Sequence, residues 1–398
     1  MADGGPRRRA AVGRGARGSL GALAVGGVRY PRAPEWELRP RPSAPVKDDM
    51  NMKYALFVPM PHAVVHTEAL QRSARGGRTD LPAGVSDPGF ILARDMTVEA
   101  DRAGYYAALF AERLLGPDLE AWCLANAVAP YTRQIRIMPA VHPGLWHPVL
   151  AAKMLASLDR IAPGRSAVNL VTGWFDREYE MFGGRPHADD REKYVEAIEW
   201  VEIIRRLYAS EQIEYHGEVH TIADGELPIA PAGGPPPFFT ASRSDEGLDM
   251  VARIADWWFV AHGKGNYLTG VSENERAFEA TLAQVTENIA KMEQLSDRYD
   301  RRVRYAINAF GVVADTDAEA VERARYLTSR ADSENPRIAM IQTSGMTAGL
   351  VGSAATIRDR IARYEELGVE LILLKVLPEV QELRTLSECI RSVSPAQS

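Results

Sequence analysis

Cysteine is scarce in this chain: its 398 residues include two, Cys123 and Cys389, which lie far apart and form no CxxC pair. So few cysteines argue against a disulfide-stabilised scaffold and against a cysteine-based zinc site. Long apolar runs are also missing, and none approaches the roughly 18 to 20 residues that cross a bilayer. We therefore expect a cytoplasmic protein that neither spans nor requires a membrane.

Positive charge is in short supply outside the N-terminal segment. Residues 1–47 hold ten Arg and Lys against three Asp and Glu, whereas the whole chain has a net charge of −6. The remainder of the chain is therefore distinctly acidic. Because an acidic surface repels the phosphate backbone, we do not expect a nucleic acid to be a partner.

The N-terminal segment has the composition of a disordered chain. Residues 1–50 are rich in Gly, Pro, Ala and Arg and lack sustained periodicity, so they predict a disordered basic extension before a single folded domain, 51–398. The weakly apolar Leu20–Val28 leaves a signal peptide open as an alternative. We favour the interpretation that translation starts at Met50 or Met52, so that the residues before that methionine are not part of the native protein.

From Lys53 onward, short apolar runs alternate with longer amphipathic stretches. The apolar runs predict eight strands: Lys53–Val58, Tyr106–Ala111, Ile135–Val141, Ala167–Thr172, Phe238–Ala241, Trp257–Ala261, Val303–Val313 and Leu371–Val376. Helices are expected at Pro88–Ala103, Leu119–Ala129, Pro148–Ile161, Asp190–Leu207, Asp245–Ile254, Glu273–Leu295, Thr316–Arg330 and Ala354–Leu367, with a small β excursion at Gln212–Ile222.

Continuous apolar strands are typical of parallel sheets that are buried on both faces. Eight of them alternating with helices predict an α/β fold, a (β/α)₈ TIM barrel with insertions, rather than an open sheet. We expect packed aliphatic layers to close one end of this barrel. The chemistry should then lie at the carboxyl ends of the strands.

Polar residues at several strand ends are candidates for that chemistry. Asn169 stands inside an apolar run, where its amide either holds the edge of a flat ligand or is a satisfied interior amide. Ser242 and Ser244 precede a helix, and they suit either a phosphate or simple N-capping. His142 and His262 follow strands and could move protons near neutral pH.

Several common catalytic signatures are missing from the sequence. It contains no GxxxxGK[ST] motif, no GxGxxG after a strand and no GxSxG, so nucleotide hydrolysis, a Rossmann site and serine-hydrolase chemistry are unsupported. His62 and His66 are four residues apart in a proline-containing stretch rather than on a helix. We expect no metal site.

Four segments of the chain resemble one enzyme family. They are His142–Pro148 (HPGLWHP), Asn169–Trp174 (NLVTGW) with Glu178 and Tyr179, Ser242–Ser244, and Gly349–Gly352. These motifs are similar to those of the bacterial-luciferase-like superfamily of flavin-dependent monooxygenases, over roughly Lys53 to Ser392. The resemblance is greatest to the two-component FMN monooxygenases that act on dimethylsulfone or pyrimidines.

This resemblance implies a monooxygenase that uses reduced FMN and O₂ through a flavin (hydro)peroxide. A separate NAD(P)H:flavin reductase would supply the reduced FMN, and the enzyme would form a homodimer or homotetramer. Matching motifs imply these flavin-binding residues: Glu112, Arg113, Asn169, Glu178, Lys193, Tyr194, Ser242 and Ser244. Asn169 and His142 are the candidate catalytic residues.

Two departures from the alkanesulfonate monooxygenases narrow the expected substrate. Those enzymes carry Arg and His where this chain has Asn308 and Phe310, and an Arg in the loop that here reads Gln342–Gly345. Because a fixed anion requires cationic donors, we expect a small neutral substrate such as a sulfone, an amide or a heterocycle. The Ser333–Gly349 loop is a predicted lid. The alternatives are a deazaflavin-dependent oxidoreductase and a non-catalytic flavin-binding protein.

Overall fold

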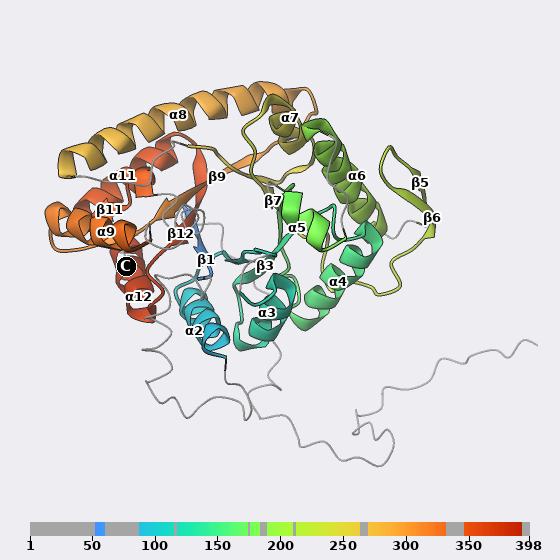
Figure 1. Cartoon of the computed structure of the whole chain (residues 1–398), viewed down its shortest axis with the longest axis horizontal. Helices are drawn as coiled ribbons and strands as arrows, with labels where there is room; N and C mark the ends of the chain where they lie inside the picture. The colour runs from blue at the N-terminus through green and yellow to red at the C-terminus, as the bar shows by residue number, and fades with distance from the viewer. Residues whose placement is uncertain are drawn as a thin grey trace, which may run out of the picture. The chain divides into compact units, whose positions relative to one another are not determined.

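A closed parallel barrel is the centre of the computed structural model (Figure 1). The structure describes residues 52–59, 87–114, 118–173, 176–183, 189–209, 212–262, 270–331 and 346–391, all within one compact unit. In barrel order, its eight strands within these ranges are β1 (Lys53–Phe57), β2 (Ala107–Phe110), β3 (Arg136–Val141), β4 (Val168–Leu170), β7 (Phe238–Thr240), β8 (Trp257–Phe259), β9 (Arg304–Phe310) and β12 (Val369–Lys375). Pairing of β12 with β1 closes the ring, which confirms the predicted TIM barrel.

Helices surround the barrel and cover its outer face (Figure 1). Among the described residues they are α2 (Pro88–Arg102), α3 (Ala121–Val128), α4 (Pro148–Ile161), α5 (Asp176–Met181), α6 (Asp190–Tyr208), α7 (Asp245–Ile254), α8 (Val271–Asp297), α9 (Asp317–Ala331), α11 (Ala354–Glu366) and α12 (Val380–Arg391). Short 3₁₀ turns are η2 (Ala129–Tyr131) and η3 (Met346–Ala348). In these ranges the structure contains no helix with both the length and the apolar character needed to cross a bilayer.

Aromatic rings and aliphatic side chains together fill the lumen of the barrel. Phe239 and Trp257 stack with ring centroids 5.4 Å apart, and the Arg304 guanidinium lies 4.0 Å from the centroid of Trp257. Glu370 accepts hydrogen bonds from Arg304 and holds this cation in place. The same lumen cluster contains aliphatic side chains, among them Leu109, Met138 and Leu371, so aromatic rings add to the expected aliphatic packing. Because the lower lumen is filled, the carboxyl ends of the strands remain the expected place for a site.

The predicted strand Val303–Val313 is two strands in the structure. Gly311 separates β9 from β10 (Val312–Val313), which pairs with β11 (Val351–Gly352) outside the barrel. A side chain at Gly311 would place a Cβ 2.5 Å from a methyl group of Leu386, so the chain passes close against α12 here. Helix α12 itself was not predicted, whereas the β excursion is confirmed as the hairpin β5 (Ile213–His216) and β6 (Thr221–Gly225).

Two predicted features fall on residues that the structure does not describe. The basic extension, 1–50, lies outside the described residues, as do His62 and His66. Of the predicted lid, Ser333–Gly349, residues 333–345 also lie outside them. The remaining part contains the buried turn η3.

Candidate active site

Asn169 lies in the barrel lumen near its carboxyl end. Ala167 belongs to the cluster of side chains that fills the lumen, and Val171 packs against the same cluster. Because alternate residues of a strand face the same side, Asn169 between them also faces the lumen. Its side chain is half-buried, so the amide remains accessible. This position fits the interpretation of Asn169 as a ligand-binding amide.

His142 extends the polar lining from the end of β3. The residue two positions earlier, Ala140, fills the lumen, and the His142 ring is buried. Burial lowers the pKa of His142 from 6.5 to about 4. Within the described part of the chain, its Nδ1 atom is buried without a hydrogen-bond partner. The ring is therefore neutral at pH 7, and it can offer a hydrogen bond to a ligand rather than a ready proton.

Tyr179 of the short helix α5 packs against the loops that follow β3 and β4. Its ring meets the His142 ring edge-on, with centroids 6.4 Å apart, and its hydroxyl donates to the Thr172 carbonyl at 3.4 Å. A Cβ at Gly144 or Gly173 would lie 2.6 or 2.5 Å from this ring. Because both positions are glycine, the Tyr179 ring can pack against the two loops beside His142.

Glu112, which follows β2, is a half-buried carboxyl group near the mouth. Its Oε2 accepts a hydrogen bond from the backbone N–H of Ala121, at the start of α3, at 2.8 Å. Burial raises the pKa of Glu112 to about 7, and the neighbouring carboxylates of Glu120 and Glu178 act in the same direction. Glu112 and Glu178, two of the predicted flavin-contacting residues, are therefore close enough to interact.

Arg113 is paired within the protein. Its guanidinium forms an ion pair with Asp118, and both side chains are largely buried. This charge is compensated, so Arg113 contributes shape and hydrogen-bonding capacity more than a free positive charge. The prediction that Arg113 lines a flavin ring stays untested.

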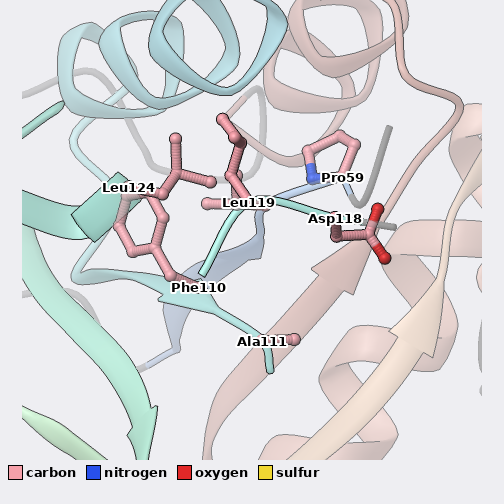
Figure 2. Close-up of a pocket in the computed structure, with 7 residues that line it drawn as sticks. Pro59, Phe110, Ala111, Asp118, Leu119 and Leu124 are labelled. Atoms are coloured by element: carbon pink, nitrogen blue, oxygen red, sulfur yellow. The ribbon is translucent and has the colours of Figure 1, made fainter. Parts of the chain in front are cut away.

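A small, shallow hollow adjoins this ion pair. Figure 2 shows the Asp118 carboxylate at one side of it and the Phe110 ring at the other. Its walls are Val58, Pro59, Phe110, Ala111, Asp118, Leu119 and Leu124. Phe110 faces the outer layer of β2 rather than the lumen, so the hollow lies beside the mouth and includes none of the predicted site residues.

Three hydroxyl groups meet at the start of α7. Ser244 caps this helix and accepts a hydrogen bond from the Gly247 N–H at 3.2 Å. The Tyr194 hydroxyl of α6 lies 2.9 Å from the Ser244 hydroxyl and 3.3 Å from that of Ser242. A Cβ at Gly247 would stand 1.8 Å from the Ser242 oxygen and 2.8 Å from the Tyr194 ring, so only glycine lets these side chains pack against the start of α7. We call Tyr194, Ser242, Ser244 and Gly247 the hydroxyl cradle.

Lys193 adds a cation beside the hydroxyl cradle. Its Nζ atom lies 5.0 Å from the centroid of the Tyr194 ring and pairs with Asp190 at 2.7 Å. Free N–H groups at a helix start, hydroxyl donors and a nearby lysine are together suited to a phosphate. The predicted residues Lys193, Tyr194, Ser242 and Ser244 thus come together from α6 and the β7–α7 connection.

Lys375 is a buried residue at the carboxyl end of the lumen that the sequence reading missed. It ends β12, two residues after the lumen-filling Leu373, and it is buried. Its Nζ atom lies over the Phe57 ring, 4.3 Å from the centroid. The signal was present in the sequence, because a lysine that continues the lumen-facing alternation of LILLK must point into the barrel.

His262, the other histidine at a strand end, is fixed by β9. Its Nε2 atom lies 2.8 Å from the Asn308 carbonyl oxygen, and burial lowers the pKa of its ring. The neutral ring must donate from Nε2, since a carbonyl oxygen only accepts. His262 is therefore held in one tautomer at the lumen mouth.

The chain matches known proteins in sequence and in fold. Residues 75–371 match the family described as Luciferase-like monooxygenase. The FMNH(2)-dependent dimethylsulfone monooxygenase of Pseudomonas fluorescens (strain Pf0-1) is 28% identical over 349 residues, which cover 78% of this chain and 93% of that protein.

Among solved structures, the monooxygenase RslO1 from Streptomyces bottropensis has a TM-score of 0.63 at 18% identity, covering 86% of this chain and 99% of that one. An F420-dependent secondary alcohol dehydrogenase has a TM-score of 0.58 at 15% identity, covering 87% and 100%. At these identities the two structures establish the fold alone.

Proposed function

Because the chain belongs to the luciferase-like monooxygenase family, as its motifs predicted, we propose that it is a two-component FMN monooxygenase. It would use reduced FMN and O₂ to oxygenate a small organic substrate at the barrel mouth. The dimethylsulfone enzyme named above is FMNH(2)-dependent, and this similarity extends over most of both chains. The cofactor and the mode of supply are thus proposed by analogy with that relative.

The observation that carries this proposal is the hydroxyl cradle. Bound FMN ends in a phosphate, and this group needs several hydrogen-bond donors close together. Tyr194, Ser242 and Ser244 supply hydroxyl groups, and the absence of a side chain at Gly247 lets them come together at the start of α7. The residues present therefore fit the phosphate end of FMN.

The lumen residues would position the other end of the cofactor and the substrate. Reduced FMN, when bound, supplies the electrons that activate O₂. The half-buried amide of Asn169 can both donate and accept, which suits the edge of a flavin ring or a bound oxygen. The neutral His142 ring can hold a hydrogen bond to a polar ligand atom, and Tyr179 keeps that ring in place.

The partners follow from the proposed chemistry. An enzyme that consumes reduced FMN as a co-substrate needs an NAD(P)H:flavin reductase to regenerate it, and we propose such a partner, together with a homo-oligomeric state. We also propose a neutral substrate, a sulfone, an amide or a heterocycle. The support is that β9 presents Asn308 and Phe310 at its carboxyl end, where a fixed anion would favour cationic groups.

A Tyr194→Phe variant tests the phosphate end of the proposed site. It removes one hydroxyl from the cradle and leaves the buried ring. We expect its affinity for FMN to fall about threefold to tenfold, the effect of one lost hydrogen bond of about 0.5–1.5 kcal/mol. Tyr215→Phe is the matched control, since that hydroxyl bonds Glu202 at 3.1 Å and touches no cradle residue. Binding is measured by titration of FMN fluorescence.

The reaction itself is tested with a flavin reductase, NADH and a panel of neutral sulfones, amides and heterocycles. We expect oxygen from ¹⁸O₂ to appear in one product. Turnover without O₂ on a reduced deazaflavin would favour the alternative oxidoreductase, and tight FMN binding without product would favour a non-catalytic protein. Equal FMN affinity in Tyr194→Phe and the wild type would count against the cradle.

A further inference from the structure

An exposed arginine stands in the chain between two residues of the hydroxyl cradle. Arg243 lies between Ser242 and Ser244 in the β7–α7 connection, and it is exposed to solvent. Within the part of the chain that the structure describes, it forms no hydrogen bond or ion pair. Consecutive Cα atoms are about 3.8 Å apart. The long side chain of Arg243 can therefore reach a group that the two serines hold.

Carboxylates close to the cradle already pair with lysines. Asp245, two residues after Arg243, forms an ion pair with Lys291. Asp190 pairs with Lys193 at 2.7 Å. Each of these pairs is neutral as a whole, so Lys193 brings little net charge to the cradle. Arg243 has no such partner among the described residues and keeps its full positive charge available.

The charge of Arg243 also acts on the barrel mouth. Burial is the main cause of the lowered pKa of His262 at the end of β8, and the nearby charge of Arg243 adds to it. Glu246, in the first turn of α7, is exposed and forms no ion pair within the described ranges. The guanidinium therefore acts between the hydroxyl cradle and the lumen without a carboxylate bound to it.

A phosphate needs charge compensation as well as hydrogen-bond donors. A phosphate monoester carries a charge of about −1.5 to −2 near pH 7, whereas the hydroxyl groups of the cradle are neutral. Hydrogen bonds between charged partners are stronger than those between neutral ones, and a guanidinium matches the geometry of phosphate oxygens. The proposed reaction brings one such anion to this place, which is the phosphate of FMN.

We propose that Arg243 supplies the positive charge that binds the FMN phosphate, so that the protein selects FMN over riboflavin, which has no phosphate. Lys193, which the family resemblance implied as a flavin-binding residue, would contribute less because it already pairs with Asp190. This inference rests on the proposed function and names the residue that sets its cofactor specificity. Arg243 is thus a specificity-determining residue.

Binding of FMN and riboflavin tests this proposal, because the two flavins differ by the phosphate alone. The full-length protein is titrated with both, in the oxidised form by flavin fluorescence and in the reduced form without O₂. We expect Arg243→Gln to weaken FMN binding about tenfold or more, and riboflavin binding less than about twofold. Arg243→Lys should keep part of the preference for FMN, because it keeps the charge but loses the fork geometry.

Two further variants and the salt dependence separate local from general effects of charge. Arg253→Gln is the matched control, since it removes an exposed arginine that pairs with Glu202 near the other end of α7, and it should leave the FMN-to-riboflavin ratio unchanged. Lys193→Gln should lower that ratio less than Arg243→Gln does. Salt raised from about 0.05 M to about 0.5 M should weaken FMN binding more in the wild type than in Arg243→Gln.

An unchanged ratio in Arg243→Gln, or an equal change in Arg253→Gln, would overturn the proposal. An equal loss of affinity for both flavins would also overturn it, because Arg243 would then act on the ring rather than the phosphate. Oxygen insertion by the wild type together with an unchanged ratio in Arg243→Gln would leave the proposed function standing. A preference for FMN that Arg243→Gln abolishes, in a protein that inserts no oxygen, would refute the proposed function and leave this inference standing.

Discussion

The buried His142 ring should make the protein less stable in mild acid. Its pKa is lowered by burial from 6.5 to about 4 in the folded state, so between these values the unfolded chain binds a proton that the folded chain does not. Stability therefore rises with pH through this window and is lost as the pH falls through it. The full depression corresponds to about 3 kcal/mol between pH 6.5 and pH 4.

Urea denaturation of a His142→Gln variant measures this contribution directly. Glutamine keeps a polar side chain of similar length but does not titrate. We expect the free energy of unfolding of the wild type to fall more steeply than that of the variant between about pH 6.5 and pH 5, by about 2 kcal/mol. His262 and His220 are shifted in the same direction, so they contribute to both proteins alike and cancel in the difference.

The exposed His216 of β5 provides the matched control, and His216→Gln should reproduce the wild-type pH dependence. Parallel curves for the wild type and His142→Gln would refute the reasoning. That result would mean that the His142 ring is solvated or charged in the folded protein. It would also reopen a role for His142 as a proton donor at neutral pH.

Two further substitutions test the packing around the site. Gly173→Ala should lower the free energy of unfolding by more than about 2 kcal/mol, because its φ is +87° and a Cβ would lie 2.5 Å from the Tyr179 ring. Gly164 has a φ of +70° and no atom within 4 Å of an added Cβ, so Gly164→Ala should lower it by about 1 kcal/mol. Equal losses for the two variants in urea denaturation would contradict this reasoning. Glu199→Ala should cost about 2 kcal/mol and speed proteolysis within 212–225, because that carboxylate accepts from three backbone N–H groups of the β5–β6 turn, the shortest at 2.5 Å. An unchanged rate of proteolysis within the hairpin would count against this role of Glu199. The stability and the proteolysis rate of Glu199→Gln should lie between those of the wild type and Glu199→Ala.

Much of the fold could be predicted because its signals are local. Helix α4 begins and ends at the predicted residues, Pro148 and Ile161, since proline favours the first turn and the apolar stripe continues to the end. Each barrel strand overlaps a predicted apolar run, because a strand buried on both faces needs no polar alternation. The hydroxyl cradle was also foreseeable in part, as Ser244 has the form of an N-cap.

The features that escaped prediction depend on contacts between distant segments. The break at Gly311 exists because Leu386, 75 residues further along, packs against it. Helix α12 completes the outer layer, and it is the exception, because Leu383, Leu386 and Ile390 recur at spacings of three and four and gave a local signal that was missed. The aromatic part of the lumen packing depends on Phe239 and Trp257 meeting across neighbouring strands. Sequence periodicity locates an element but not the residue that will face it.

The cationic side chains near the carboxyl end of the barrel bear on whether the substrate is neutral or anionic. The neutral-substrate prediction rested on missing cations at Asn308 and Phe310, yet β12 presents Lys375 at the same end of the lumen. Arg113 is compensated by Asp118, and Lys193 pairs with Asp190 beside the hydroxyl cradle, away from the carboxyl end of β9. A lysine whose pKa lies near 7 can be neutral or charged according to its ligand. A comparison of a neutral sulfone with a sulfonate as substrates is therefore the test of the neutral-substrate proposal.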